Sequence, residues 1–313
     1  MGRRQYLLHT NFHGRRTELS GASTEAECST FCGLSTVCAS GRISYTLCTR
    51  KSAELCNLVS VGTNRKSIID LAAASHIPAP PDSLELPFYY VASAFDFPFL
   101  LVLRHNGEWD LARWGLVPFW TKTLEQATNI RRQTVNARSE SMWQKPAFKE
   151  AANGGRCLIP VDGFFEFHHH GGKAYPFYIH LEGHPAFFLA GLRQTWRNPE
   201  SLDPEATCSI VTTSANTFMT EIHNKLPQPS ERRMPVIVPA EQVHSWLSPA
   251  TPVESLRAIV SSRPIPRLKA HAVNRALNRA ATRSNDSTAQ DPTFYPELAE
   301  LAARLSLLTE RYA

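Results

Sequence analysis

The stretch CLIPVDGFFEF, residues 157–167, decides the fold of this chain because it embeds a single acid in a run of strand-forming residues. Aliphatic and aromatic residues of this kind fit the pleated, half-buried surface of a β-sheet. Glu166 lies among Phe164, Phe165 and Phe167, where a carboxylate is costly to bury. We therefore predict a buried strand that carries a functional acid, whose pKa is raised toward neutrality by partial desolvation.

Several other runs share this composition, and together they indicate the fold class. Strand patterns occupy residues 88–95, 97–105, 175–182, 186–192 and 208–213. Asn106-Gly107 is a strong hairpin signal. Short helices are predicted between strands, as at residues 66–75, 146–152 and 215–223. This irregular mixture predicts an α+β fold, with a curved, mostly antiparallel sheet or open barrel and short helices.

The chain divides into three predicted parts. Residues 1–36 have no clear period and are interpreted as an irregular N-terminal extension, absent from the active form. Residues 37–283 form the folded domain. Residues 284–313 comprise a polar linker and a terminal helix over 296–312, whose apolar residues recur at helical spacing.

Charge and composition narrow the classes of function. The net charge of +5 is compatible with a nucleic-acid partner. A membrane span and a secretory signal are both missing from the sequence, which predicts a cytoplasmic protein. Nucleotide-binding signatures such as the P-loop are also missing, so we expect no cofactor.

Cysteine and histidine patterns do not predict a metal site. Five of the seven cysteines, at positions 28, 32, 38, 48 and 56, are spaced by 4, 6, 10 and 8 residues, unlike the paired spacing of a zinc ribbon. The run His168-His169-His170 precedes Gly171-Gly172 and is interpreted as a solvated hairpin turn.

Polar pairs at alternate strand positions are the candidates for chemistry. In TVNARSE, residues 134–140, Asn136 and Arg138 point to one face of a strand. Asp162 and Glu166 are predicted to share a face in the same way. His223 ends a predicted helix, and Arg233 begins the strand that follows it.

An aromatic cluster precedes these residues. ARWGLVPFW, residues 112–120, contains Trp114, Phe119 and Trp120 next to Arg113. The simplest interpretation is core packing. The alternative is a surface on which bases stack.

Taken in order, these segments resemble the SOS-response-associated peptidase (SRAP) family. The resemblance runs from about residue 41 to 280 and rests on RWGLVPFW, NARSE, RCLIPVDGFFEF, YPFYIHL, SIVTTSAN and RMPVIVP. It implies recognition of abasic sites in single-stranded DNA and a covalent crosslink to them. In such proteins an N-terminal cysteine captures the sugar aldehyde, its amine forming a Schiff base and its sulfur closing a thiazolidine ring. The resemblance also implies a peptidase activity, the self-removal of the leader residue.

The resemblance implies roles for individual residues. Asn136 holds the N-terminal residue and the sugar, and Arg138 grips a phosphate next to the lesion. Glu166 is the catalytic acid, and His223 assists proton transfer. Arg42 and Trp114 complete the expected DNA-binding set, and we expect a monomer.

The chain departs from the family at its start. Met1 is followed by Gly2-Arg3-Arg4, where the family has Met-Cys-Gly-Arg. The best match to the later part of that motif is residues 41–45, and the nearest upstream thiol is Cys38. Because an internal cysteine has no free amine, we expect Cys38 to become N-terminal in the active form.

Two other functions stay open at this point. The chain could be a thiol peptidase that acts on other polypeptides, with Cys38 as nucleophile and His223 as base. It could also be a non-catalytic module that binds single-stranded DNA and has lost the nucleophile.

Overall fold

The computed structural model describes residues 57–311, except residues 63, 202, 226–231, 262–264, 266 and 279–284. These residues belong to one compact unit, Lys51–Ala313. The predicted extension over residues 1–36 lies outside the described residues, as do Cys38 and Arg42.

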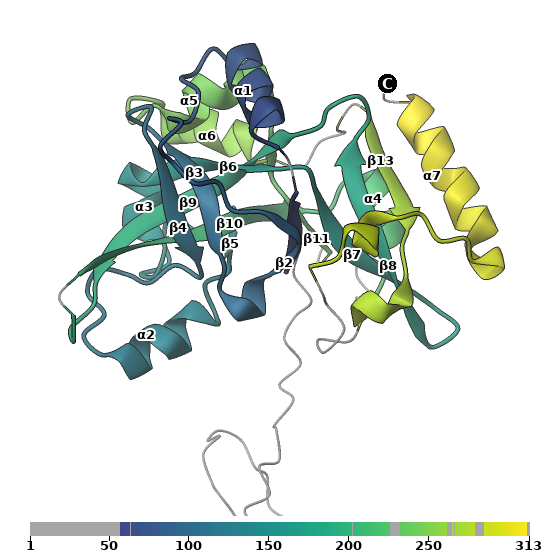
Figure 1. Cartoon of the computed structure of the whole chain (residues 1–313), viewed down its shortest axis with the longest axis horizontal. Helices are drawn as coiled ribbons and strands as arrows, with labels where there is room; N and C mark the ends of the chain where they lie inside the picture. The colour runs from purple at the N-terminus through teal and green to yellow at the C-terminus, as the bar shows by residue number, and fades with distance from the viewer. Residues whose placement is uncertain are drawn as a thin grey trace, which may run out of the picture. The chain divides into compact units, whose positions relative to one another are not determined.

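Five strands form a closed barrel (Figure 1). They pair in the order β4, β3, β6, β9 and β10, and β10 pairs back onto β4 in parallel, which closes the ring. The strands are β3 (Phe99–Arg104), β4 (Trp109–Trp114), β6 (Arg156–Val161), β9 (Phe187–Arg197) and β10 (Pro204–Ser214). The predicted α+β class is confirmed, and the barrel is closed because the long β10 reaches both β9 and β4.

Three short strands extend this barrel next to β10 and β9. They are β5 (Asn136–Arg138), β11 (Arg233–Pro235) and β12 (Ile237–Val238). β5 lies parallel to β10, with Ile210 opposite Asn136 and Thr212 opposite Arg138. β11 lies antiparallel to the same end of β10, and β12 pairs with β9. The end of β10 therefore pairs with both β5 and β11.

A second, fully antiparallel sheet has the strand order β13-β8-β7-β1-β2. Its strands are β1 (Leu58–Val61), β2 (Tyr89–Ser93), β7 (Gly163–His170), β8 (Lys173–Leu181) and β13 (Leu268–Ala272). The β7–β8 hairpin turns at Gly171 and Gly172, both with positive φ, a conformation open to glycine at little cost. The interpretation of His168–His170 as a solvated turn is wrong, because these residues belong to β7.

Successive side chains along each barrel strand point to opposite faces, and each face contributes to a different hydrophobic core. One core fills the barrel, with Val102, Trp114 and Ile159 among its members, and continues onto the second sheet. The other lies between the barrel's outer surface and four helices drawn above and beside it in Figure 1. These helices are α1 (Arg65–Ala74), α3 (Lys149–Gly154), α5 (Val243–Leu247) and α6 (Val253–Ile259).

Two more helices pack against the second sheet, α4 (Thr217–Ile222) and α7 (Ala299–Arg311), beside β13 in Figure 1. Thr309 of α7 donates a hydrogen bond to the carbonyl of Leu268, 2.8 Å away. The remaining α-helix is α2 (Leu124–Arg131), and 3₁₀ turns span Ala94–Asp96, Ala240–Gln242, Arg275–Asn278, Ser287–Gln290 and Pro296–Leu298. Within the described ranges, every helix is too short or too polar to cross a bilayer.

Candidate active site

The structure brings Glu166 and His223 together. Glu166 lies on β7, and His223 is the residue that ends α4. Oε2 of Glu166 is 3.6 Å from Nδ1 of His223, within reach of an ion pair. The two residues are 2% and 0% exposed, so bulk water does not screen their interaction. A buried acid and a histidine in contact form a unit that can exchange protons.

Glu166 is oriented by its own strand. Its Oε1 accepts the backbone N–H of Phe167 at 3.0 Å, and this contact leaves Oε2 turned toward His223. Phe164 and Phe165 on the same strand are buried. The carboxylate is therefore enclosed by buried aromatic side chains of its own strand.

The surroundings of His223 favour one tautomer. Nδ1 lies 3.1 Å from the carbonyl oxygen of Arg233 and 3.3 Å from its N–H. Two acceptors therefore face Nδ1, the carbonyl oxygen of Arg233 and Oε2 of Glu166, against one donor, the N–H of Arg233. This surplus of acceptors favours a proton on Nδ1. Among the described residues, Nε2 has no hydrogen-bond partner. In the neutral ring this nitrogen carries the lone pair and serves as a base.

Arg233 is held in place by an acid from the other side. Its guanidinium, almost fully buried, binds both carboxylate oxygens of Glu140 and donates to the carbonyl of Thr212 at 2.6 Å. Burial acts to raise the pKa of Glu140, but hydrogen bonds, first that from Arg233, bring it below its ordinary value. Because the backbone of Arg233 contacts His223, the hydrogen bond to Thr212 and the pairing of β11 with β10 anchor the histidine to β10. The ion pair with Glu140 fixes the guanidinium.

Asn136 and Arg138 come from β5, on the face opposite Ala137, which packs in the outer core. Asn136 is buried and donates from Nδ2 to Oδ1 of Asn57, 3.0 Å away. Since Leu58 pairs with Phe165, the preceding residue Asn57 lies at the register position opposite Glu166. Asn136 therefore connects to the Glu166 side of the pair.

Arg138 is exposed, and its guanidinium has no ion pair or hydrogen bond with the residues that the structure describes. A cation presented on a strand edge in this way is available to an external anion.

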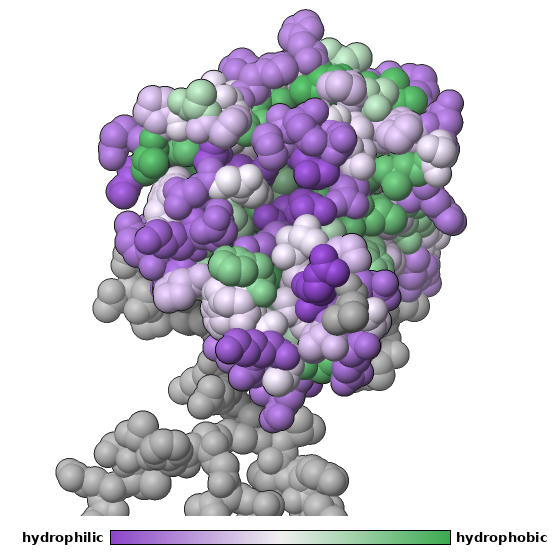
Figure 2. Space-filling model, turned by 90° about the vertical axis from the view of Figure 1, so that its left-hand side faces the viewer, coloured by the Kyte–Doolittle hydropathy of each residue, from purple (hydrophilic) through white to green (hydrophobic). Residues whose placement is uncertain are grey.

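The assignment of Trp114 to a stacking surface is wrong. Its side chain is 0% exposed and faces the barrel interior, and Nε1 donates to the carbonyl of Val135 at 2.8 Å. Phe119 and Trp120, which follow in the loop, are 61% and 46% exposed. Figure 2 shows one face of the molecule, on which hydrophobic surface occurs in small areas broken by hydrophilic residues. A stacking surface on this segment is left to Phe119 and Trp120.

Asp162 does not join the site. It lies at the bend between β6 and β7, and its carboxylate accepts from the N–H of Gly62 at 3.2 Å and from Gln290 at 3.3 Å. Four strand positions place it about 13 Å from Glu166. Burial raises the pKa of Asp162. The two acids therefore share no partner.

The thiols that the structure describes are inert. Cys157 and Cys208 lie in the barrel core, where burial raises the pKa of Cys157 to about 12 and that of Cys208 well above its ordinary value. Such thiols stay protonated and do not act as nucleophiles. Within the described ranges, three or more metal-ligating side chains are nowhere grouped to hold an ion.

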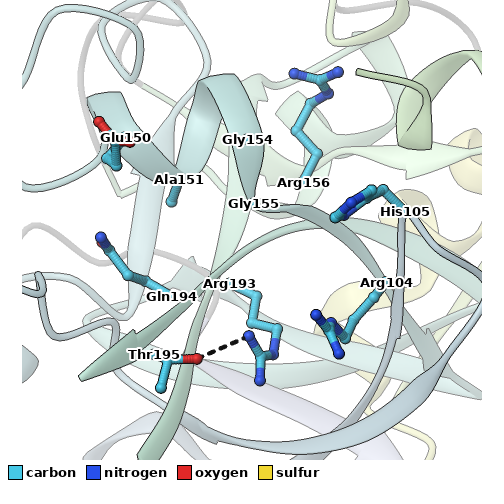
Figure 3. Close-up of a pocket in the computed structure, with 10 residues that line it drawn as sticks. All are labelled: Arg104, His105, Glu150, Ala151, Gly154, Gly155, Arg156, Arg193, Gln194 and Thr195. Carbon is cyan, nitrogen blue, oxygen red and sulfur yellow. Dashed lines mark hydrogen bonds between the residues drawn. The ribbon is translucent and has the colours of Figure 1, made fainter. Parts of the chain in front are cut away.

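Figure 3 shows a pocket of about 250 Å³ on the barrel's outer side that contains none of the predicted site residues. Its three arginines already have partners. Arg104 pairs with Glu108, Arg193 with Asp110, and Arg156 donates to four backbone carbonyls. These guanidinium groups are therefore already engaged within the protein.

A closed barrel, a flanking antiparallel sheet and a buried acid–histidine pair define this α+β protein. Comparison with known proteins identifies its family. The chain belongs to the SOS response associated peptidase (SRAP) family, whose model matches residues 40–280.

Relatives and solved structures agree with this assignment. Abasic site processing protein YoqW of Bacillus subtilis is 32% identical over 200 residues, which cover 63% of this chain and 84% of that protein. Abasic site processing protein HMCES of Gallus gallus is 29% identical over 185 residues, 53% and 52% of the two chains. A crystal structure of a protein from Bacteroides thetaiotaomicron matches with a TM-score of 0.67 and 27% identity, covering 76% of this chain and 100% of that one.

Proposed function

We propose that this chain binds single-stranded DNA at abasic sites and joins to them covalently through Cys38 once that residue is N-terminal. The observation that carries the proposal is the buried Glu166–His223 pair, whose histidine keeps an unpartnered Nε2 among the described residues. The similarity to abasic site processing proteins supports DNA containing such sites as the partner.

The chemistry needs proton transfer at each step. The sugar opens to its aldehyde, and the amine of Cys38 adds to the aldehyde carbon. Protonation of the resulting hydroxyl lets water leave and gives the imine. The sulfur then adds to the imine carbon, and the thiol proton ends on the nitrogen, which closes the thiazolidine ring. Nε2 of His223 takes up the amine proton, and the Nδ1 proton of the charged ring passes to Glu166. Glu166 then supplies the proton that leaves with water, help typically worth about 10²–10⁴-fold in rate.

DNA contacts follow from exposure and charge. We expect the exposed guanidinium of Arg138 to bind a phosphate, with Asn136 two positions earlier on the same face. Phe119 and Trp120 take the stacking role in place of Trp114.

The decisive experiment compares two starts of the chain. A protein that begins Met-Cys38, from which the Met is removed, is incubated with an abasic single-stranded oligonucleotide and resolved on a denaturing gel. We expect a heat-stable adduct. The full-length chain, shown by mass to be uncleaved, should give none, since the nitrogen of its Cys38 is in a peptide bond. The same stable adduct from the uncleaved chain would refute the N-terminal-amine mechanism.

The same gel separates the alternatives. Cys38→Ser in the short chain keeps the amine, so borohydride should trap a Schiff base although the ring cannot close. DNA binding with no covalent product from either chain would support the non-catalytic module. Cleavage of unrelated peptides would support the peptidase acting in trans, with a thiol other than the protonated Cys157 and Cys208.

A further inference from the structure

The edge of β7 beyond Phe165 has an unusual set of partners. β1 pairs with β7 only from Gly163 to Phe165, so no described strand covers the rest of that edge. Strand-edge N–H and C=O groups need partners when they are shielded from water. The N–H of Phe167 binds Oε1 of Glu166. The next residue on this edge, His169, finds its partner in a side chain from a different element.

That side chain belongs to Asn224. Its Oδ1 accepts the N–H of His169 at 2.7 Å, and its Nδ2 donates to the carbonyl of His169 at 2.9 Å. The planar amide of Asn224 thus replaces a peptide group of a neighbouring strand. Asn224 directly follows His223, so this pair of hydrogen bonds attaches the chain to β7 one residue beyond the histidine.

A second contact attaches the chain just before the histidine. Nδ1 of His168 lies 2.9 Å from the carbonyl oxygen of Glu221, and burial lowers the pKa of His168, which keeps its ring a neutral donor. Residues 221 and 224 are therefore both fixed to β7, the strand that carries Glu166. The 3.6 Å separation of the catalytic pair is set between these two attachments.

We propose that Asn224 is a positioning residue that sets the distance and the tautomer of His223 relative to Glu166. It acts through backbone attachment and does not touch the substrate. The proposal rests on the proposed function for its rate measurement only, because the state of the His223 ring can be measured without DNA.

The test uses Asn224→Ala, which removes both hydrogen bonds, and Asn224→Ser, which cannot reach both groups of His169. Asn129→Ala, an exposed asparagine of α2, is the matched control. ¹⁵N chemical shifts of the His223 ring report its tautomer. We expect the Nδ1-protonated signature in the wild type and the control, and its loss in both Asn224 variants. Single-turnover adduct formation should slow by about tenfold or more, with single-stranded DNA affinity within twofold.

The outcomes are separable. Thermal melting identifies a variant that fails to fold, and the Ser variant then decides the result. An unchanged His223 ring signature in a folded Asn224 variant would overturn the proposal. If the wild type forms no adduct, the proposed function fails, and the ring signature still decides the role of Asn224.

Discussion

Replacing Glu166 by Gln keeps the shape of the side chain and removes its charge and its titrating proton. The new Oε1 still accepts the N–H of Phe167, so the strand is undisturbed. The new amide, however, presents N–H donors toward Nδ1 of His223, where the wild type presents an acceptor. The variant therefore lacks both the acid and the group that favours a proton on Nδ1.

The size of the effect follows from the geometry. At 3.6 Å, an ionised Glu166 and a protonated His223 attract by about 4–5 kcal/mol with an effective dielectric constant of about 20. Since 1.36 kcal/mol is tenfold in rate, losing all of it would slow a step that develops charge on His223 by about 10³-fold. The cost of desolvating the pair offsets part of this attraction. We expect adduct formation to slow by about 10²–10³-fold.

The assay is single-turnover adduct formation on abasic single-stranded DNA, with binding to intact single strands measured separately. The control is Glu241→Gln, an exposed acid in the turn Ala240–Gln242. Affinity should stay within threefold of the wild type because neither side chain of the buried pair is exposed to bind a phosphate. An adduct rate within threefold of the wild type would refute the role of Glu166, and so would a loss explained entirely by weaker binding.

Three further predictions use other parts of the structure. Arg138→Ala should reduce the slope of log K against log salt by about 0.7 for single-stranded DNA, whereas Arg132→Ala, an exposed arginine at the end of α2, should not. Arg156→Met leaves the carbonyls that the buried guanidinium binds without a donor. It should lower the free energy of unfolding, measured in urea, by about 2–4 kcal/mol. The control Arg132→Met should leave the free energy of unfolding almost unchanged. Glu140→Gln should destabilise the protein above pH 4.5, the ordinary pKa of a glutamate, because the pKa of the Glu140 carboxyl is lowered in the folded state. The difference in unfolding free energy between variant and wild type should shrink as the pH falls through that lowered pKa. A difference that stays constant with pH would contradict the role of the Glu140–Arg233 ion pair.

Strand content, fold class and the buried acid could be predicted from the sequence, because each has a local signal. His223 has no such signal, and its role beside Glu166 is expected only from the family resemblance. Aromatic and β-branched runs mark strands, and a carboxylate among phenylalanines stands out. Which face of a strand points inward depends on how the barrel closes, and closure depends on β10 pairing with both β9 and β4. Core packing, the simplest interpretation of residues 112–120, is therefore right for Trp114 but wrong for the exposed Phe119 and Trp120.

The contacts of Asn224 could not be predicted from the sequence, for a different reason. Its partner His169 lies 55 positions away, and the contact joins a side chain to a backbone. A contact of this kind leaves no periodic pattern or characteristic residue spacing in the sequence. The prediction of one strand over residues 157–167 was wrong, because a bend at Asp162 divides this run into β6 and β7 of different sheets. The bend gives the Asp162 carboxylate other partners than Glu166.

Because Cys157 and Cys208 are enclosed in the barrel, their reactivity reports how often the barrel opens. Seven thiols are present in the chain, and these two have no route to a reagent while the barrel is closed. A thiol-modifying dye can reach them only when strands separate, so their labelling rate reports the free energy of that opening. Mass spectrometry after a labelling pulse would then count closed and opened molecules in one sample, without any engineered probe.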